Sequence, residues 1–271
     1  MEDTVSQIVR EAIVKIIRDT TSEVNIRKSL QLHEAKIHFV PTKYRVLGGL
    51  LQSLNIKFGN FIEKLIALVV ERDGYVEAMP ASGKKIRLSM TARTDARIDQ
   101  YITTRQLPGS PDLCDDQFRD LLEEIVGIET TSQEVKQTIT KDVDALFKSR
   151  TGQNVYLEIK YNDDHDTGKF VDINRKFIKT YAGLVNYLNI TKTSQFKPIL
   201  YYFNPVKRWG PIYTPSDHIY RGAQLFDEFF QIKFSDIDEY LRKLGDDESI
   251  ISIFDELYLS IRYGSPNKRL L

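Results

Sequence analysis

The chain has 271 residues, of which 41% are hydrophobic, so it can bury the core of one large domain. Its 38 basic and 38 acidic residues cancel, and this balance neither indicates nor excludes a nucleic-acid partner, because charges can still be segregated by face. A single cysteine excludes an internal disulfide, and since no apolar run is long enough for a bilayer and no secretory signal opens the chain, we expect a cytosolic protein.

The first third of the chain is predicted to be helical. Apolar residues at three- and four-residue spacing predict a helix over 3–19. A second helical pattern covers 41–51 and a third covers 61–74. The pair Gly48 and Gly49 inside the second pattern lowers helix propensity, which suggests close packing or a break at that point.

The middle of the chain has weaker signals. Residues 82–105 are polar and basic, and a loop rich in proline and glycine follows around Pro108. Residues 115–126 are predicted to form a short helix, while 132–140 have no clear assignment.

The second half of the chain predicts a mixed α/β core. A long amphipathic segment separates the second strand from the third, so these two strands are expected to be parallel. We expect one domain over 1–271, with a helical N-terminal layer (1–75), an α/β core (76–233) and C-terminal helices (234–271). The predicted elements are two paired strands, a helix, a strand and two helices, at 143–148 and 154–160, 177–188, 197–203, 235–244 and 248–262.

The strand pair contains the strongest chemical signal. Side chains alternate along a strand, so Glu158 and Lys160 project to one side while Ile159 points to the other. Pairing of the strands would bring Asp144 to the same patch. Two fixed carboxylates suit Mg²⁺, and a neighbouring lysine can orient or deprotonate an attacking water. This is the apparatus for hydrolysing a phosphodiester.

Local sequence also allows other interpretations of these residues. The three side chains could be solvated groups on a half-exposed sheet, although an unpaired Glu158 in a buried strand would be costly. Asp142 would face the same side as Asp144, and we prefer Asp144 because buried-face residues flank it. Glu63, in the third helix, is a further candidate for the site. The alternative is that Glu63 is an exposed surface acid paired with a neighbouring lysine.

Basic residues near the strand pair are candidate DNA contacts. The acidic loop that leaves the second strand is typical of a solvated turn, but it is placed to meet a groove of DNA. The basic stretch 84–105 is a second candidate for phosphate contact, or else a solvated surface. The individual DNA-binding candidates are Lys141, Lys169, Asn174, Arg175, Lys176, Lys207 and Arg208.

Three blocks of the chain resemble a known family. The first is PTKYRVLGGLLQSLNIKFGNFIEKLIALV, the second is the strand pair with Asp144, Glu158 and Lys160, and the third is LYYFNPVKRWGPIY with GAQLFDEFFQIKFSDIDEYL. Together they span about 41–240 and are similar, in the same order, to the Hinf-type group of type II restriction endonucleases with a PD-(D/E)xK core.

The resemblance implies a restriction-endonuclease-like fold, with a central mixed sheet flanked by helices, and a Mg²⁺-dependent site. Asp144, Glu158 and Ile159 would hold the metal, Lys160 would position the attacking water and Glu63 would support the site. The expected partner is double-stranded DNA, and the expected working form is a homodimer. We expect neither a nucleotide cofactor nor an association with a membrane. The alternatives are a structure-specific repair or recombination nuclease, and a DNA-binding module with inert carboxylates.

Overall fold

The protein, as a computed structural model, contains two compact units. One is formed by Met1–Phe61 with Phe234–Leu271, and the other by Ile62–Lys233. The single-domain organisation stays a prediction. No described helix combines the length and the apolarity that a bilayer crossing requires. The structure describes residues 2–75, 85–107, 114–163, 166–206 and 213–263.

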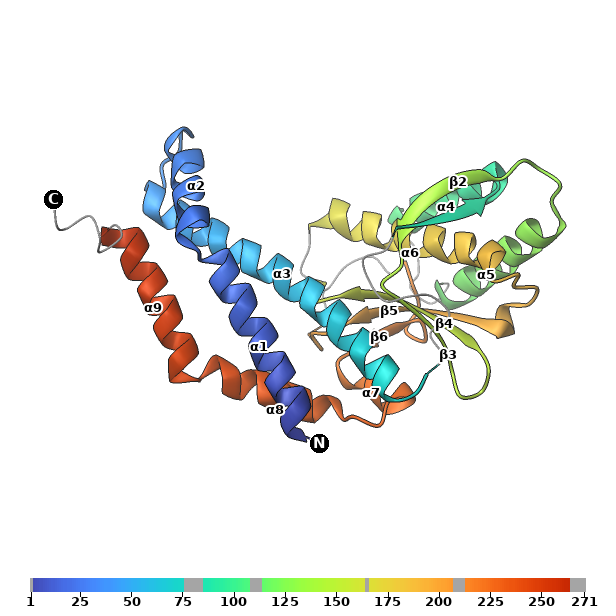
Figure 1. Ribbon diagram of the computed structural model, residues 1–271. Helices are drawn as coiled ribbons and strands as arrows, with labels where there is room; N and C mark the ends of the chain where they lie inside the picture. Colours follow the sequence, from blue (N-terminus) through green and yellow to red (C-terminus); the bar gives the residue numbers. More distant parts are fainter. Residues whose placement is uncertain (1, 76–84, 108–113, 164–165, 207–212, 264–271) are drawn as a thin grey trace. The chain divides into compact units, whose positions relative to one another are not determined.

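The first unit is helical. Two apolar clusters form its core, one around Ile17 and Leu54 and the other around Val46 and Leu50. The predicted helices at 3–19, 235–244 and 248–262 are confirmed, while α2 has no counterpart in the prediction. Its helices are α1 (Glu2–Thr20), α2 (Glu23–Glu34), the first part of α3 (Thr42–Arg72), α8 (Phe234–Gly245) and α9 (Glu248–Tyr263) (Figure 1).

The expected break near Gly48 and Gly49 is wrong, because α3 continues from Thr42 to Arg72 as one helix. The expectation of close packing holds at Gly49. A Cβ atom built there would lie 3.3 Å from the His33 imidazole of α2. The absence of a side chain lets α2 approach the long helix at this point, and apolar contacts on both sides compensate for the low helix propensity of glycine.

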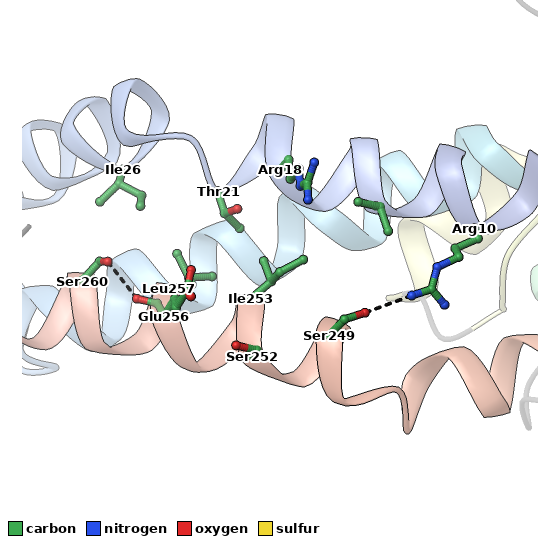
Figure 2. A pocket seen from close by; sticks show the side chains of 11 residues that line it. Arg10, Arg18, Thr21, Ile26, Ser249, Ser252, Ile253, Glu256, Leu257 and Ser260 are labelled. Atoms are coloured by element: carbon green, nitrogen blue, oxygen red, sulfur yellow. Dashed lines mark hydrogen bonds between the residues drawn. The ribbon is translucent and has the colours of Figure 1, made fainter. Parts of the chain in front are cut away.

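A cavity of about 680 Å³ lies beside α1 and α9 in this unit (Figure 2). The Arg10 guanidinium reaches across it and donates to the Ser249 hydroxyl at 3.0 Å and to the Asp247 carboxylate at 2.7 Å. Glu256 is the one acid in its lining. The lining of this cavity therefore lacks the paired carboxylates that were predicted from the sequence.

The second unit is built on a four-stranded mixed sheet in the order β3-β4-β5-β6. β3 and β4 are antiparallel, as the predicted strand pair requires, and β5 is parallel to β4 as expected. β6 was not predicted and adds a second parallel pair. The strands are β3 (Ala145–Lys148), β4 (Asn154–Lys160), β5 (Phe196–Tyr202) and β6 (Ile219–Arg221).

A separate antiparallel pair joins β1 (Lys85–Met90) to β2 (Gln137–Asp142). The polar and basic stretch 82–105 therefore holds a strand and a helix within its described residues, and the unassigned stretch 132–140 holds most of β2. β1 alternates polar and apolar residues, with Leu88 and Met90 buried, whereas Ile139 is the single apolar residue of β2. Their pairing joins segments about fifty residues apart, which local sequence does not reveal.

Helices cover both faces of the four-stranded sheet (Figure 1). On one side the main core packs side chains such as Leu146, Tyr156 and Leu200 against three helices. On the other side Phe147 contacts Phe229 and Phe230 at the end of α7. The helices of this unit, besides the end of α3, are α4 (Ala92–Gln106), α5 (Cys114–Thr131), α6 (Thr167–Tyr187) and α7 (Ala223–Phe229).

Replacing Gly183 with alanine is expected to destabilise the second unit by about 1–3 kcal/mol. A Cβ atom at this position of α6 would lie 2.7 Å from Cβ of Leu88, so α6 and β1 would have to move apart. The matched control is Gly127→Ala in α5, where an added Cβ meets nothing within 4 Å and helix propensity favours alanine. Urea unfolding of both variants tests the difference, and equal stabilities would contradict it.

Candidate active site

The site begins with three residues on one face of β4. Tyr156, Glu158 and Lys160 alternate with Leu157 and Ile159 along the strand, so they share the face that α6 covers. Glu158 is fully buried, while the Lys160 side chain keeps 21% of its surface exposed. The predicted common face of Glu158 and Lys160 is therefore correct.

Asp144 joins this face from the neighbouring segment. It lies just before β3, not within a strand that begins at 143, because the chain turns here from the β1–β2 pair into the larger sheet. Its Oδ2 accepts from the Ile159 N–H at 2.7 Å and lies 3.5 Å from the Lys160 ammonium. The three residues predicted to converge do converge.

Asp142 was the alternative to Asp144. It is the last residue of β2 and pairs with Lys85 in the two-stranded sheet. Of these two aspartates, Asp144 is therefore the one that contacts Lys160.

The Lys160 ammonium lies among oxygens of three residues. It donates to Glu158 Oε1 at 2.7 Å and to the Ile159 carbonyl at 2.7 Å, besides its longer contact with Asp144. These oxygens belong to the three residues predicted to be metal ligands, Asp144, Glu158 and Ile159. Carboxylate and carbonyl oxygens converging on one positive charge are the ligands that a hard divalent cation prefers.

Side chains alone do not make a complete set of ligands for a divalent cation at this site. Within the described residues, no three His, Cys, Asp or Glu side chains form a group that could hold a metal. The candidate set therefore consists of two carboxylates, Asp144 and Glu158, and the main-chain oxygen of Ile159. A cation at this point would take the place of the Lys160 ammonium.

Two further donors hold Glu158. The Lys176 ammonium, from α6, reaches Glu158 Oε1 at 2.7 Å, and the Tyr156 hydroxyl donates to Oε2 at 2.8 Å. Sequence reasoning missed Tyr156, although its two-residue spacing from Glu158 places both on one face. It assigned Lys176 to DNA, since nothing local shows that α6 folds back onto β4.

Charges in the site shift the pKa values in opposite directions. Burial would raise the pKa of Glu158, but Lys160 and Lys176 outweigh it and lower that pKa. For Asp144, burial and the charge of Glu158 together raise the pKa. Burial would lower the pKa of Lys160, yet the two carboxylates raise it above its ordinary value. The two lysines therefore favour the ionised form of Glu158, and the two carboxylates favour the charged form of Lys160.

Glu63 lies close enough to the site for the charges of Asp144, Lys160 and Glu158 to affect its pKa. It belongs to the last part of α3, in the second unit. Burial, followed by the charge of Asp144, raises the pKa of Glu63 to about 7. The predicted helical carboxylate is thus placed near the site, and its role stays a prediction.

Glu63→Gln is expected to flatten the pH dependence of stability in metal-free buffer. The folded protein keeps a proton on Glu63 up to pH of about 7, whereas an ordinary glutamate releases it near 4.5. This contribution to stability is complete below about 4.5 and is lost as the pH rises through 7. Urea unfolding at pH 5 and pH 8 should show a larger loss for the wild type than for the variant.

Glu71→Gln is the control for that measurement, because Glu71 is an exposed acid of the same helix. It should follow the wild type at both pH values. Parallel behaviour of the wild type and Glu63→Gln would contradict the raised pKa of Glu63.

The predicted DNA-binding residues have different environments. Asn174 is buried, donates to the Phe170 carbonyl at 2.9 Å and accepts from the Thr214 hydroxyl at 2.9 Å, so its amide is occupied inside the protein. This burial argues against a base-reading role for it. Arg175 pairs with Asp99 and Asp172 at the surface.

The other basic candidates stay predictions. Lys141 lies on β2, where burial and then the charges of Lys176 and Lys179 lower its pKa. Lys169 is exposed in the first turn of α6. Lys207 and Arg208 lie outside the described residues.

The acidic loop between β4 and α6 has a structural use. Asp163 is buried and pairs with Arg221 at 2.6 Å, and Asp166 caps α6 by accepting from the Lys169 N–H at 3.0 Å. These contacts fix where α6 begins, and hence where Lys176 meets β4. The described residues at the two ends of this loop are therefore held by specific contacts, unlike those of a solvated turn.

A mixed sheet flanked by helices, with paired carboxylates and a lysine on one strand face, defines a restriction-endonuclease-like protein. The chain belongs to the HinfI family of type II restriction endonucleases, whose model matches residues 1–245. It is 44% identical over 265 residues to the type II restriction enzyme HinfI of Haemophilus influenzae, covering 96% of this chain and 98% of that enzyme. No solved structure matches the chain significantly.

Proposed function

We propose that this protein hydrolyses both strands of double-stranded DNA at a short specific sequence, with Mg²⁺ as cofactor and 5′-phosphate ends as products. Membership of a type II restriction endonuclease family supports the reaction class. The observation that carries the chemistry is the contact of the Lys160 ammonium with Glu158 and Asp144, at 2.7 and 3.5 Å.

Each residue of the site has a proposed role. Asp144, Glu158 and the Ile159 carbonyl would hold the divalent cation, which supplies charge neutralisation at the scissile phosphate and a lower pKa for water. Lys160 would leave their oxygens, orient the attacking water and stabilise charge developing on the phosphate. Glu63 would take up a proton or add a further oxygen at the edge of the site.

A two-fold symmetric DNA target needs one active site for each strand, so we infer a homodimer. Lys141, Lys169 and Arg175, with Lys207 and Arg208, are proposed contacts of the DNA backbone. The cytosol is the proposed location.

Incubation of phage DNA with the purified protein tests the proposal. We expect discrete fragments with Mg²⁺ and intact DNA with EDTA, and sequencing of the fragment ends would give the target and the position of the cut. Intact DNA under all conditions would contradict the proposal. Cleavage of branched or damaged DNA alone would favour a structure-specific nuclease.

A further inference from the structure

The Glu158 carboxylate accepts hydrogen bonds from three side chains, two on β4 and one on α6. Lys160 and Lys176 both donate to Oε1, and Tyr156 donates to Oε2. The carboxylate is fully buried, so these donors supply the hydrogen bonds that water would otherwise make.

One of the three donors has to leave during the proposed reaction. The Lys160 ammonium occupies the point on which the oxygens of Asp144, Glu158 and Ile159 converge. It must move from there to reach a water or a phosphate. When a buried carboxylate loses a hydrogen-bond donor, the folded state loses stability and the carboxylate can rotate. Other donors can prevent both effects.

We propose that Lys176, together with Tyr156, is a positioning residue that keeps Glu158 oriented toward Asp144 when Lys160 turns to the DNA. The inference rests on the proposed function and extends it, because it assigns a second lysine and a tyrosine to the same site.

The packing of α6 on β4 favours this role. The Tyr156 ring stacks on Phe177 with ring centroids 5.6 Å apart, and Phe177 follows Lys176 on α6. Both rings are fully buried. The stack therefore fixes helix and strand together at the position where the hydroxyl and the ammonium meet Glu158 (α6 and β4 in Figure 1).

The competing interpretation makes Lys176 a DNA phosphate contact, as the sequence suggested. Its side chain is 32% exposed, but its ammonium is engaged by a buried carboxylate. The two roles predict different measurements. A phosphate contact contributes to DNA affinity and to its salt dependence, whereas a positioning residue contributes to the rate of cleavage.

The kinetic test uses Lys176→Met, which removes the charge and keeps much of the stem, and Lys176→Arg, which restores a cationic donor. Single-turnover cleavage should fall by about 10–100-fold in Lys176→Met and recover at least in part in Lys176→Arg. DNA affinity in EDTA, measured at several salt concentrations, should match the wild type. Tyr156→Phe should also slow cleavage, and the double variant should lose less than the product of the two single effects.

Lys179→Met is the matched control. Lys179 lies one turn further along α6 and pairs with Asp95 and Asp99 at 2.7 and 3.1 Å, away from Glu158. It should cleave at the wild-type rate. A wild-type rate in Lys176→Met, or weaker DNA binding with a salt slope smaller by about one, would overturn the inference.

A spectroscopic measurement separates this inference from the proposed function. In protein with ¹³C-labelled glutamate carboxyls, the Glu158 resonance is assigned by its disappearance in Glu158→Gln. It should shift in Lys176→Met and in Tyr156→Phe, and stay in place in Lys179→Met. An unchanged resonance in Lys176→Met overturns the inference even in an active enzyme. If the wild type cut no DNA, the proposed function would fail while the resonance still tested the contact.

Discussion

Asp144→Asn should reduce DNA cleavage by on the order of 10³-fold while leaving DNA affinity intact. The amide keeps the size of the carboxylate and still accepts from the Ile159 N–H, but it loses the negative charge that would hold a divalent cation. Burial and the charge of Glu158 both raise the pKa of Asp144, so the folded protein without metal bears a cost for this charge. The variant should therefore unfold at the wild-type temperature or higher in EDTA.

Asp142→Asn is the control for this result. It changes an acid two residues away that pairs across the β1–β2 sheet. We expect wild-type cleavage from it, measured under single-turnover conditions beside Asp144→Asn. Normal cleavage by Asp144→Asn would remove this residue from the site, and loss of cleavage only in Asp142→Asn would show that the alternative acid is the functional one.

Lys160→Met should lower the cleavage rate by on the order of 10²–10³-fold. It should also make folding stability depend on divalent cations. Removing the ammonium leaves Asp144 and Glu158 facing each other with one positive partner fewer, so thermal stability in EDTA should fall. Since a bound ion stabilises the folded state by mass action, Ca²⁺ should raise the melting temperature of this variant more than that of the wild type.

Lys136→Met provides the comparison, because Lys136 also lies against a buried acid, Glu129, at 3.7 Å. Its melting temperature should fall without any added response to Ca²⁺. An equal response to Ca²⁺ in the wild type, Lys160→Met and Lys136→Met would contradict the placement of the cation at Lys160.

Elements with a local pattern could be predicted from sequence. The strand pair around Gly152 and the amphipathic stripes of α1, α8 and α9 are recognisable within ten to twenty residues, because their apolar spacing matches one period. The parallel pairing of β4 and β5 followed from the helix between them.

Elements that depend on partners distant in the chain could not be predicted from the sequence. β1 and β2 are polar strands that bury few residues, and each needs the other for its hydrogen bonds. The long α3 contains three glycines, two of them adjacent, which lower its local helix propensity, and tertiary packing overrides that preference.

The same distinction between local patterns and distant contacts applies to the residues of the site. Asp144, Glu158 and Lys160 could be predicted because they lie within or directly beside one strand pair, in a stretch of 17 residues from 144 to 160. Lys176 was assigned to DNA and lay just before the helix predicted at 177–188. Its contact with Glu158 could not be predicted, because it depends on how α6 folds back onto β4. Tyr156 had an available signal in its spacing, but its apolar ring suggested only the core.

The most direct measurement is the anomalous scattering of Mn²⁺ in crystals of the protein with its target DNA. We expect a peak at coordination distance from oxygens of Asp144, Glu158 and Ile159, beside the scissile phosphate, with the Lys160 ammonium displaced from its present position. A peak on other residues, or a phosphate in place beside the two carboxylates without any metal, would contradict the proposed site.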